Sequence, residues 1–164
     1  MSATSPGPRV LRAGDGDVTG NAGNLDRYLL ESGASGGHIA LVEHILEPKV
    51  LAAPIHRHSR EDEYSFVLTG TLGVIEDGVE ITASSGDLVS KPRGRWHTFW
   101  NAGDDQLRVL EIVSPGGIED LFRRLADPGG EYSPATLPAL AAQYGAEVDF
   151  DATMPLVDKH GLRF

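Results

Sequence analysis

The segments HRHSREDE, residues 56–63, and GDLVSKPRGRWHTFWN, residues 86–101, decide the expected fold. Residues two apart on a β-strand face the same side, so His56 and His58 can point together into a barrel. Their Cα atoms would lie roughly 6–7 Å apart, and two imidazoles at that spacing can converge on one metal ion. After a turn of four residues, Glu63 opens the next strand and would bring a carboxylate oxygen to the same ion.

The second segment predicts a strand, a Pro92-x-Gly94 turn and a further strand that His97 opens. Because proline and glycine restrict the geometry of the turn, the position of the His97 imidazole is set by the backbone. The sequence contains no cysteine, so a metal must be held by imidazole and carboxylate, as suits Fe, Ni, Mn, Co or Zn. We therefore expect one divalent metal ion, with His56, His58, Glu63 and His97 as its ligands.

Outward from these segments, short apolar runs alternate with turn residues, as in an antiparallel barrel. Asp77-Gly78 predicts a two-residue hairpin, because both central residues of a type I′ turn need positive φ. The expected strands are Arg9–Ala13, Leu25–Glu31, His38–Leu46, Ile55–His58, Glu63–Thr69, Leu72–Glu76, Val79–Thr82, Asp87–Lys91, His97–Asn101 and Gln106–Val113.

After Pro115 the apolar spacing becomes helical. It predicts one helix ending near Ala126, a second from a Ser133 cap to Gly145, and a short third over Pro155–His160. The expected organisation is a flexible N-terminal lead over residues 1–8, a β-barrel over 9–115, and a helical C-terminal tail over 116–164 packed on the barrel.

The two segments resemble the two motifs of the cupin superfamily. Val50 replaces the first glycine of G-x5-H-x-H-x(3,4)-E-x6-G, whereas every fixed position of G-x5-P-x-G-x2-H-x3-N is matched, from Gly86 to Asn101. The resemblance covers about residues 25–113. It implies an all-β fold, a double-stranded β-helix (the jelly-roll or cupin barrel) with a short C-terminal helical tail. The chain looks most similar to small single-domain cupins of the quercetin dioxygenase-like branch.

That resemblance implies a metal-dependent dioxygenase acting on a small enolisable or aromatic substrate, flavonol- or diketone-like, with Glu63 as catalytic base as well as ligand. Two alternatives stay open: a non-oxidative isomerase, cyclase or decarboxylase that uses the metal as a Lewis acid, and a non-catalytic cupin that binds a small molecule. Some cupin-fold sugar epimerases work with barrel histidines and no metal. They need a tyrosine over the sugar, and Tyr64 should face away from Glu63.

Strand alternation from the ligands also predicts the pocket wall. Ser65, Val67 and Phe99 should line the pocket, whereas Trp96 and Trp100 should face away, into the sheet–sheet core or a subunit interface.

Four polar residues outside the motifs lie in apolar strands. We expect His38 and His44 on the surface or at an interface, since neither has a partner in register. Glu43 and Glu111 could support a ligand histidine, but outward orientation toward solvent is the stronger expectation.

Composition excludes several classes of protein. The 164 residues are 40% hydrophobic and carry a formal net charge of −10, which disfavours nucleic acid as a partner. No apolar run approaches the ~20 residues that span a bilayer, and the N-terminus lacks the apolar core of a secretory signal. We therefore expect a cytoplasmic protein with a small-molecule partner and no membrane contact, which forms a homodimer through sheet edges.

Overall fold

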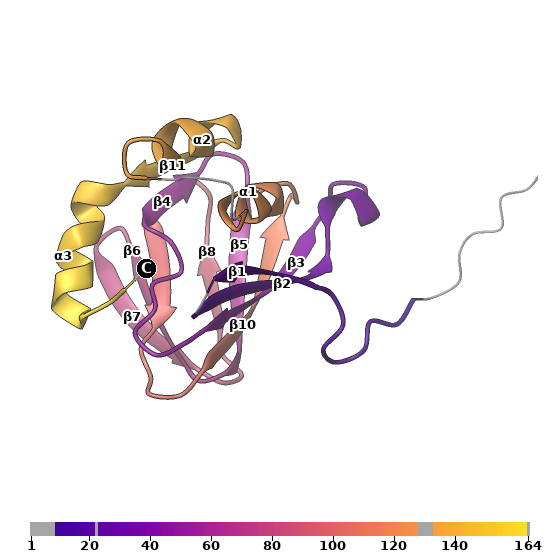
Figure 1. Ribbon diagram of the computed structural model, residues 1–164, viewed down its shortest axis with the longest axis horizontal. Helices are drawn as coiled ribbons and strands as arrows, with labels where there is room; N and C mark the ends of the chain where they lie inside the picture. The colour runs from indigo at the N-terminus through magenta and orange to yellow at the C-terminus, as the bar shows by residue number, and fades with distance from the viewer. Residues whose placement is uncertain (1–8, 22, 128–132, 164) are drawn as a thin grey trace, which may run out of the picture.

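The computed structural model describes residues 9–21, 23–127 and 133–163, and two antiparallel sheets form its barrel (Figure 1). The six-stranded sheet has the order β1 (Asp17–Asn21), β2 (Asn24–Leu30), β3 (Ala40–Leu46), β10 (Leu107–Ser114), β5 (Asp62–Thr69) and β8 (Leu88–Lys91). The five-stranded sheet has the order β11 (Ala146–Asp149), β4 (Ile55–His58), β9 (His97–Asn101), β6 (Thr71–Glu76) and β7 (Val79–Ser84). This is the expected all-β jelly roll.

The core between the sheets follows strand alternation. Leu107 and Val109 of β10 are fully buried. Val67 of β5, which lies opposite Val109 in the strand register, is fully buried as well. Gly73 of β6 lies against the Trp100 ring, where a Cβ atom would come within 2.2 Å of the indole. Only glycine therefore lets β6 and Trp100 of β9 pack this closely. At the β6–β7 hairpin, Asp77 and Gly78 both have positive φ, 45° and 83°, as the sequence predicted.

Among the described residues, three helices follow β10, and Figure 1 shows α1 and α2 over one end of the barrel and α3 along its side. Their bounds are α1 Glu119–Leu125, α2 Leu137–Gln143 and α3 Phe150–His160, and a short 3-10 helix, Ser32–Ala34, lies between β2 and β3. Trp100 is buried with Leu156 of α3 and with Leu162, so it faces away from the barrel interior as expected. It packs in a helix–sheet core, however, and not in the expected sheet–sheet core or subunit interface.

Four predictions of elements were wrong or incomplete. Helix α2 begins at Leu137, with Thr136 and not Ser133 at its N-cap position. Residues 9–13 form no strand and are exposed; the edge strand is β1, whose polar sequence has no apolar alternation to reveal it. The tail is not wholly helical, because β11 pairs with β4. Helix α3 begins before Pro155, since Asp149 caps it by accepting a hydrogen bond from the Ala152 amide at 2.8 Å. The predicted N-terminal lead, residues 1–8, lies outside the described residues.

Candidate metal centre

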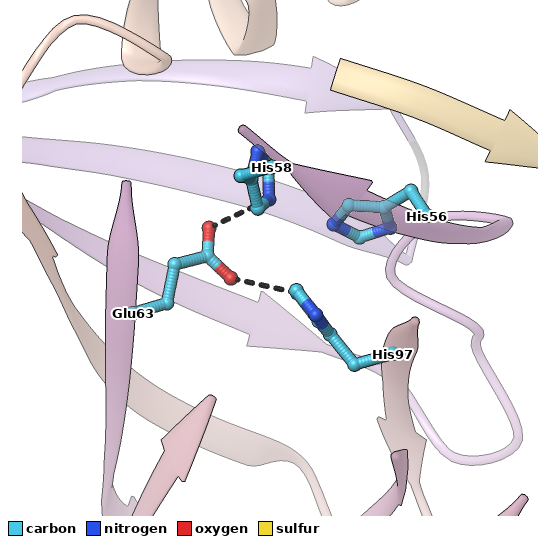
Figure 2. A group of neighbouring side chains, drawn as sticks. All are labelled: His56, His58, Glu63 and His97. Carbon is cyan, nitrogen blue, oxygen red and sulfur yellow. Dashed lines mark hydrogen bonds and ion pairs between the residues drawn. The ribbon is translucent and has the colours of Figure 1, made fainter. Parts of the chain in front are cut away.

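Three strands bring the four predicted ligands together at one end of the barrel. His56 and His58 lie on β4, Glu63 near the start of β5, and His97 at the start of β9 directly opposite His56 in the strand register. One potential ligand atom from each side chain lies within 4.8 Å of the others. Figure 2 shows the three imidazoles and the carboxylate converging on a common centre.

Backbone carbonyls fix two of the imidazoles. His56 donates through Nδ1 to the Pro54 carbonyl at 2.7 Å, and His97 donates through Nδ1 to the Arg95 carbonyl at 3.0 Å. Because a carbonyl only accepts, Nδ1 carries the proton in the neutral ring and Nε2 keeps its lone pair. The Nε2 atom of His97 lies 3.1 Å from Glu63 Oε2, at the centre of the cluster.

The third imidazole, His58, is 2% exposed, and neither ring nitrogen has a hydrogen-bond partner in the described part of the chain. Its Nε2 lies 3.4 Å from Glu63 Oε1 and its Nδ1 lies 3.8 Å from the buried carboxylate of Glu61. Burial lowers the pKa of His58, and burial together with the two neighbouring imidazoles lowers that of His56 well below its ordinary value. Neutral imidazoles and an orphaned buried nitrogen beside a carboxylate fit a divalent cation.

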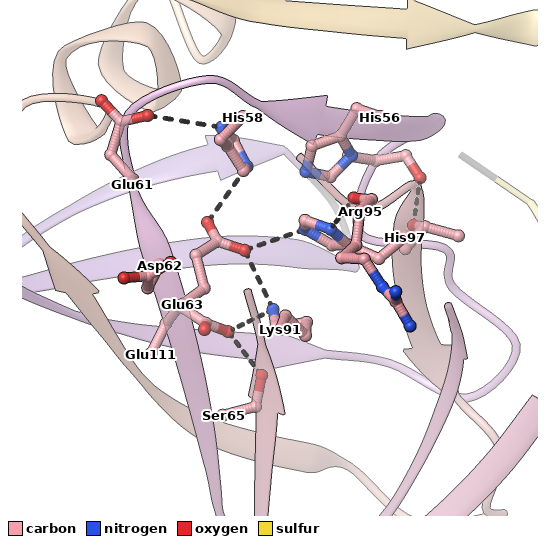
Figure 3. Close-up of polar contacts among 12 residues, drawn as sticks. His56, His58, Glu61, Asp62, Glu63, Ser65, Lys91, Arg95, His97 and Glu111 are labelled. Atoms are coloured by element: carbon pink, nitrogen blue, oxygen red, sulfur yellow. Dashed lines mark hydrogen bonds and ion pairs between the residues drawn. The ribbon is translucent and has the colours of Figure 1, made fainter. Parts of the chain in front are cut away.

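A second buried group supports Glu63 from below (Figure 3). Lys91 Nζ lies 3.1 Å from Glu63 Oε2 and 3.0 Å from Glu111 Oε2, and Ser65 donates to Glu111 at 2.7 Å. Burial alone would raise the pKa of Glu63, but Lys91 and the imidazoles outweigh it and hold that pKa well below its usual range. Burial likewise opposes charge on Lys91, but Glu111 and Glu63 raise the lysine pKa. The carboxylate is therefore ionised and fixed.

The expectation for Glu111 was wrong, and Lys91 was missed. Glu111 faces inward and is fully buried because Lys91 compensates its charge, so it does not point to solvent. Strand alternation could have predicted that Lys91 points inward, because Val89, two residues earlier on β8, lies on the same side and is buried. Glu43 is on the outward face of β3, as expected, but it is buried under Arg27 and Arg108 rather than solvated.

The cluster opens into a pocket with an empty volume of ≈ 950 Å³, part of it open solvent. Phe99 lies on its wall, but Ser65 and Val67 do not: both are fully buried deeper in the barrel, Ser65 against Glu111 and Val67 in the apolar core. Sequence reasoning also missed the opposite wall, which the C-terminal segment supplies. Its lining residues there are Leu121, Phe122, Leu125 and Ala126 from α1 and its end, Leu137 and Ala141 from α2, and Ala146 and Val148 from β11.

The expectation for His44 was also wrong. His44 is 7% exposed and lines the same pocket, with Nδ1 at 2.6 Å from Asp26 Oδ1. Its partner Asp26 lies directly opposite His44 in the register of β2 and β3, a register that was not identified from the sequence. His38, by contrast, is exposed, as expected.

Fold and site together define a small jelly-roll protein with a candidate three-histidine, one-glutamate metal centre in an apolar-walled pocket. Residues 42–113 match the Cupin_2 family, described as a cupin domain. This matched segment contains all four candidate ligands, His56, His58, Glu63 and His97. Within the described residues, no helix is long and apolar enough to cross a membrane.

The proteins to which this chain is similar carry names of different enzyme activities. Over 77 residues, 46% of this chain, the sequence is 39% identical to "Oxidoreductase iacF" of Pestalotiopsis fici, of which the match spans only 32%. A structure named as a cupin sugar phosphate isomerase from Silicibacter pomeroyi aligns with TM-score 0.50 and 26% identity over 56% of this chain and 59% of that chain. A predicted oxalate decarboxylase from Thermotoga maritima aligns with TM-score 0.60 and 20% identity over 65% and 99%, which supports the fold.

Proposed function

We propose that this protein is a metal-dependent dioxygenase that acts on a small enolisable or aromatic substrate, flavonol- or diketone-like. The observation that carries the proposal is the convergence of four ligand atoms within 4.8 Å of one another beside an apolar-walled pocket. The similarity to a protein named an oxidoreductase supports the same reading. A redox-capable divalent metal bound by His56, His58, Glu63 and His97 would supply open coordination positions and would mediate electron transfer from the substrate, which is the reductant, to O2.

The chain's own residues have three tasks in this proposal. Glu63, ionised and held by Lys91, accepts a proton from a substrate carbon or hydroxyl beside the centre. Because its pKa is low, Glu63 is a weak base, so the group that it deprotonates would need to be acidified by coordination to the metal, as a flavonol hydroxyl or the C–H of a diketone would be. Phe99 and the helical wall exclude water from the reacting atoms. Lys91 keeps the carboxylate oriented between strands β5 and β8.

A non-oxidative reaction is the second candidate. The similarity to a structure named as a sugar phosphate isomerase favours it, because proton transfer beside a carbonyl needs the same metal ligands and the same carboxylate but no oxygen. Turnover without O2, or with redox-inert zinc, would distinguish this candidate from the dioxygenase.

Metal content of the purified wild type and of His97→Ala, measured by plasma mass spectrometry, is the first test. We expect close to one equivalent per chain in the wild type and loss in the variant, with His38→Ala, an exposed histidine outside the cluster, as matched control. Oxygen uptake by the loaded protein with flavonols, diketones and catechols follows. No metal in the wild type after reconstitution would refute the metal centre. Metal without oxygen uptake would refute the dioxygenase.

The homodimer and the cytoplasmic location stay predictions. In support of a dimer, each sheet ends in an edge strand with exposed apolar residues, Val79 and Ile81 on β7 and Leu88 on β8.

A further inference from the structure

The pocket has a second polar point that the candidate metal centre does not use. Nδ1 of His44 on β3 lies 2.6 Å from Oδ1 of Asp26 on β2, and Nδ1 donates this hydrogen bond to the carboxylate oxygen. The His44 side chain is 8% exposed. Its other nitrogen, Nε2, makes no hydrogen bond to the residues that the structure describes, and it is not one of their fully enclosed atoms, so it keeps some exposure. Both His44 and Asp26 line the pocket.

Aromatic rings hold the His44 imidazole between the metal centre and the helical wall. Its ring centroid lies 5.3 Å from that of Phe99 and 5.7 Å from that of Phe122. Phe99 follows the ligand His97 by two residues on β9, so its ring extends into the same interior. The pocket therefore presents two polar points, the ligand cluster and His44, with the apolar Phe99 ring beside both.

Charge in this part of the pocket favours the protonated imidazole. Burial by itself lowers the pKa of His44, but the Asp26 carboxylate more than offsets it and leaves that pKa raised; Glu111 acts in the same direction and Lys91 against it. A protonated His44 has a second N–H, at Nε2, in an apolar cavity. A ligand carboxylate in the pocket would accept a charge-assisted hydrogen bond from this N–H.

We propose that His44, positioned by Asp26, binds a carboxylate of the substrate at the end remote from the metal centre. The substrate class is then a compact, largely apolar acid with metal-binding oxygens at one end and a carboxylate at the other. This inference rests on the proposed function, because it assigns the metal-binding end of the substrate to the cluster of His56, His58, Glu63 and His97. His44 determines specificity here and takes no part in the reaction itself.

Two probes isolate the carboxylate. Catechol and 3,4-dihydroxybenzoate share two adjacent hydroxyls, and only the second carries a carboxylate. Both are titrated by calorimetry into zinc-loaded protein, because redox-inert zinc does not support oxygenation of either probe. We expect the wild type to bind the carboxylated probe about tenfold more tightly, as one charge-assisted hydrogen bond predicts. In His44→Phe, which keeps a ring against Phe99 and Phe122, this preference should vanish while catechol affinity is unchanged. Asp26→Asn, which retains an acceptor for Nδ1 without the charge, should reduce the preference several-fold.

The outcomes separate this inference from the proposed function. Zinc bound normally with equal affinity for both probes in the wild type would overturn the inference alone. An equal loss of affinity for both probes in His44→Phe would also overturn the inference, since the His44 imidazole would then serve only to close the pocket. Failure of the wild type to bind zinc would overturn the proposed function and the inference with it. If His44→Phe does not fold, Asp26→Asn decides, and an unchanged preference there would refute the role of His44. The control is His38→Phe, which should keep the preference.

Discussion

The side chains inside the barrel are polar at one end and apolar at the other, and the paired strands β5 and β10 show the change. Along β5 the inward side chains are Glu63, Ser65 and Val67, and along β10 the residues paired with Ser65 and Val67 are Glu111 and Val109. One end is therefore ionised and hydrogen-bonded, and the other is aliphatic.

The two ends contribute differently to stability: the apolar end stabilises the fold, whereas the charged groups of the polar end are held in place by it. The apolar end gains free energy by burial, at roughly 25 cal/mol per Å² of apolar surface removed from water. The polar end buries two carboxylates and one ammonium group, whose desolvation opposes folding unless all three remain paired. A cation at the ligand cluster would add positive charge beside Glu63. The polar end should therefore respond to metal, and the apolar end should not.

Lys91→Met should have the largest effect on stability. It leaves Glu63 and Glu111 buried without their cation, and breaking a buried pair typically costs about 3–5 kcal/mol of unfolding free energy. Zinc should restore part of this loss, because it neutralises Glu63 but not Glu111. Urea denaturation with chelator and with zinc measures both quantities.

The matched variant for Lys91→Met is Leu107→Ala at the apolar end, where the side chain is fully buried. It should cost about 2–5 kcal/mol through lost transfer energy and a cavity. The difference in unfolding free energy between Leu107→Ala and the wild type should be the same with zinc as with chelator, because zinc should stabilise both proteins equally. Equal zinc responses in the two variants would contradict the division into two ends.

Acidification should destabilise the metal-free protein by a smaller amount. The folded pKa values of His56 and His58 lie below the ordinary value of 6.5, so these residues contribute stability above that pH, which is lost as the pH falls and the unfolded chain takes up protons. The two together should cost about 2 kcal/mol between pH 7 and 5.5. Urea denaturation in chelator at constant ionic strength measures it.

His44 should act with the opposite sign in the same experiment. Its folded pKa is raised, so its contribution is complete below the unfolded value of 6.5 and is lost as the pH rises through the folded pKa. The loss on acidification should therefore be steeper in His44→Phe than in the wild type. An identical slope in the two proteins would show that Asp26 does not hold a proton on His44.

The sequence predicted the clustering of the four candidate ligands and most of the barrel because both depend on local spacing. His56 and His58 share a face by alternation, and the Pro92–Gly94 turn fixes where β9 begins with His97. It did not predict the pairing of Asp26 with His44, which comes from strands brought side by side by folding. The helical wall of the pocket escaped prediction for the same reason. Glu111 was misjudged because burial of a carboxylate is disfavoured until its lysine partner is known.

Arg57→Met should have the smallest effect, and it tests whether burial rather than pairing makes Lys91 important. Arg57 donates from Nε and Nη2 to the two carboxylate oxygens of Glu147 at 3.1 and 2.9 Å, a better geometry than that of Lys91. The two side chains are 37% and 59% exposed, so water already solvates both charges. Methionine keeps an unbranched stem over Trp96, beside which the guanidinium lies at 4.7 Å. We expect no resolvable change in the urea midpoint or in metal content. A loss comparable to that of Lys91→Met would mean that the Arg57–Glu147 pair holds β11 on β4, and with it the strand that carries His56 and His58.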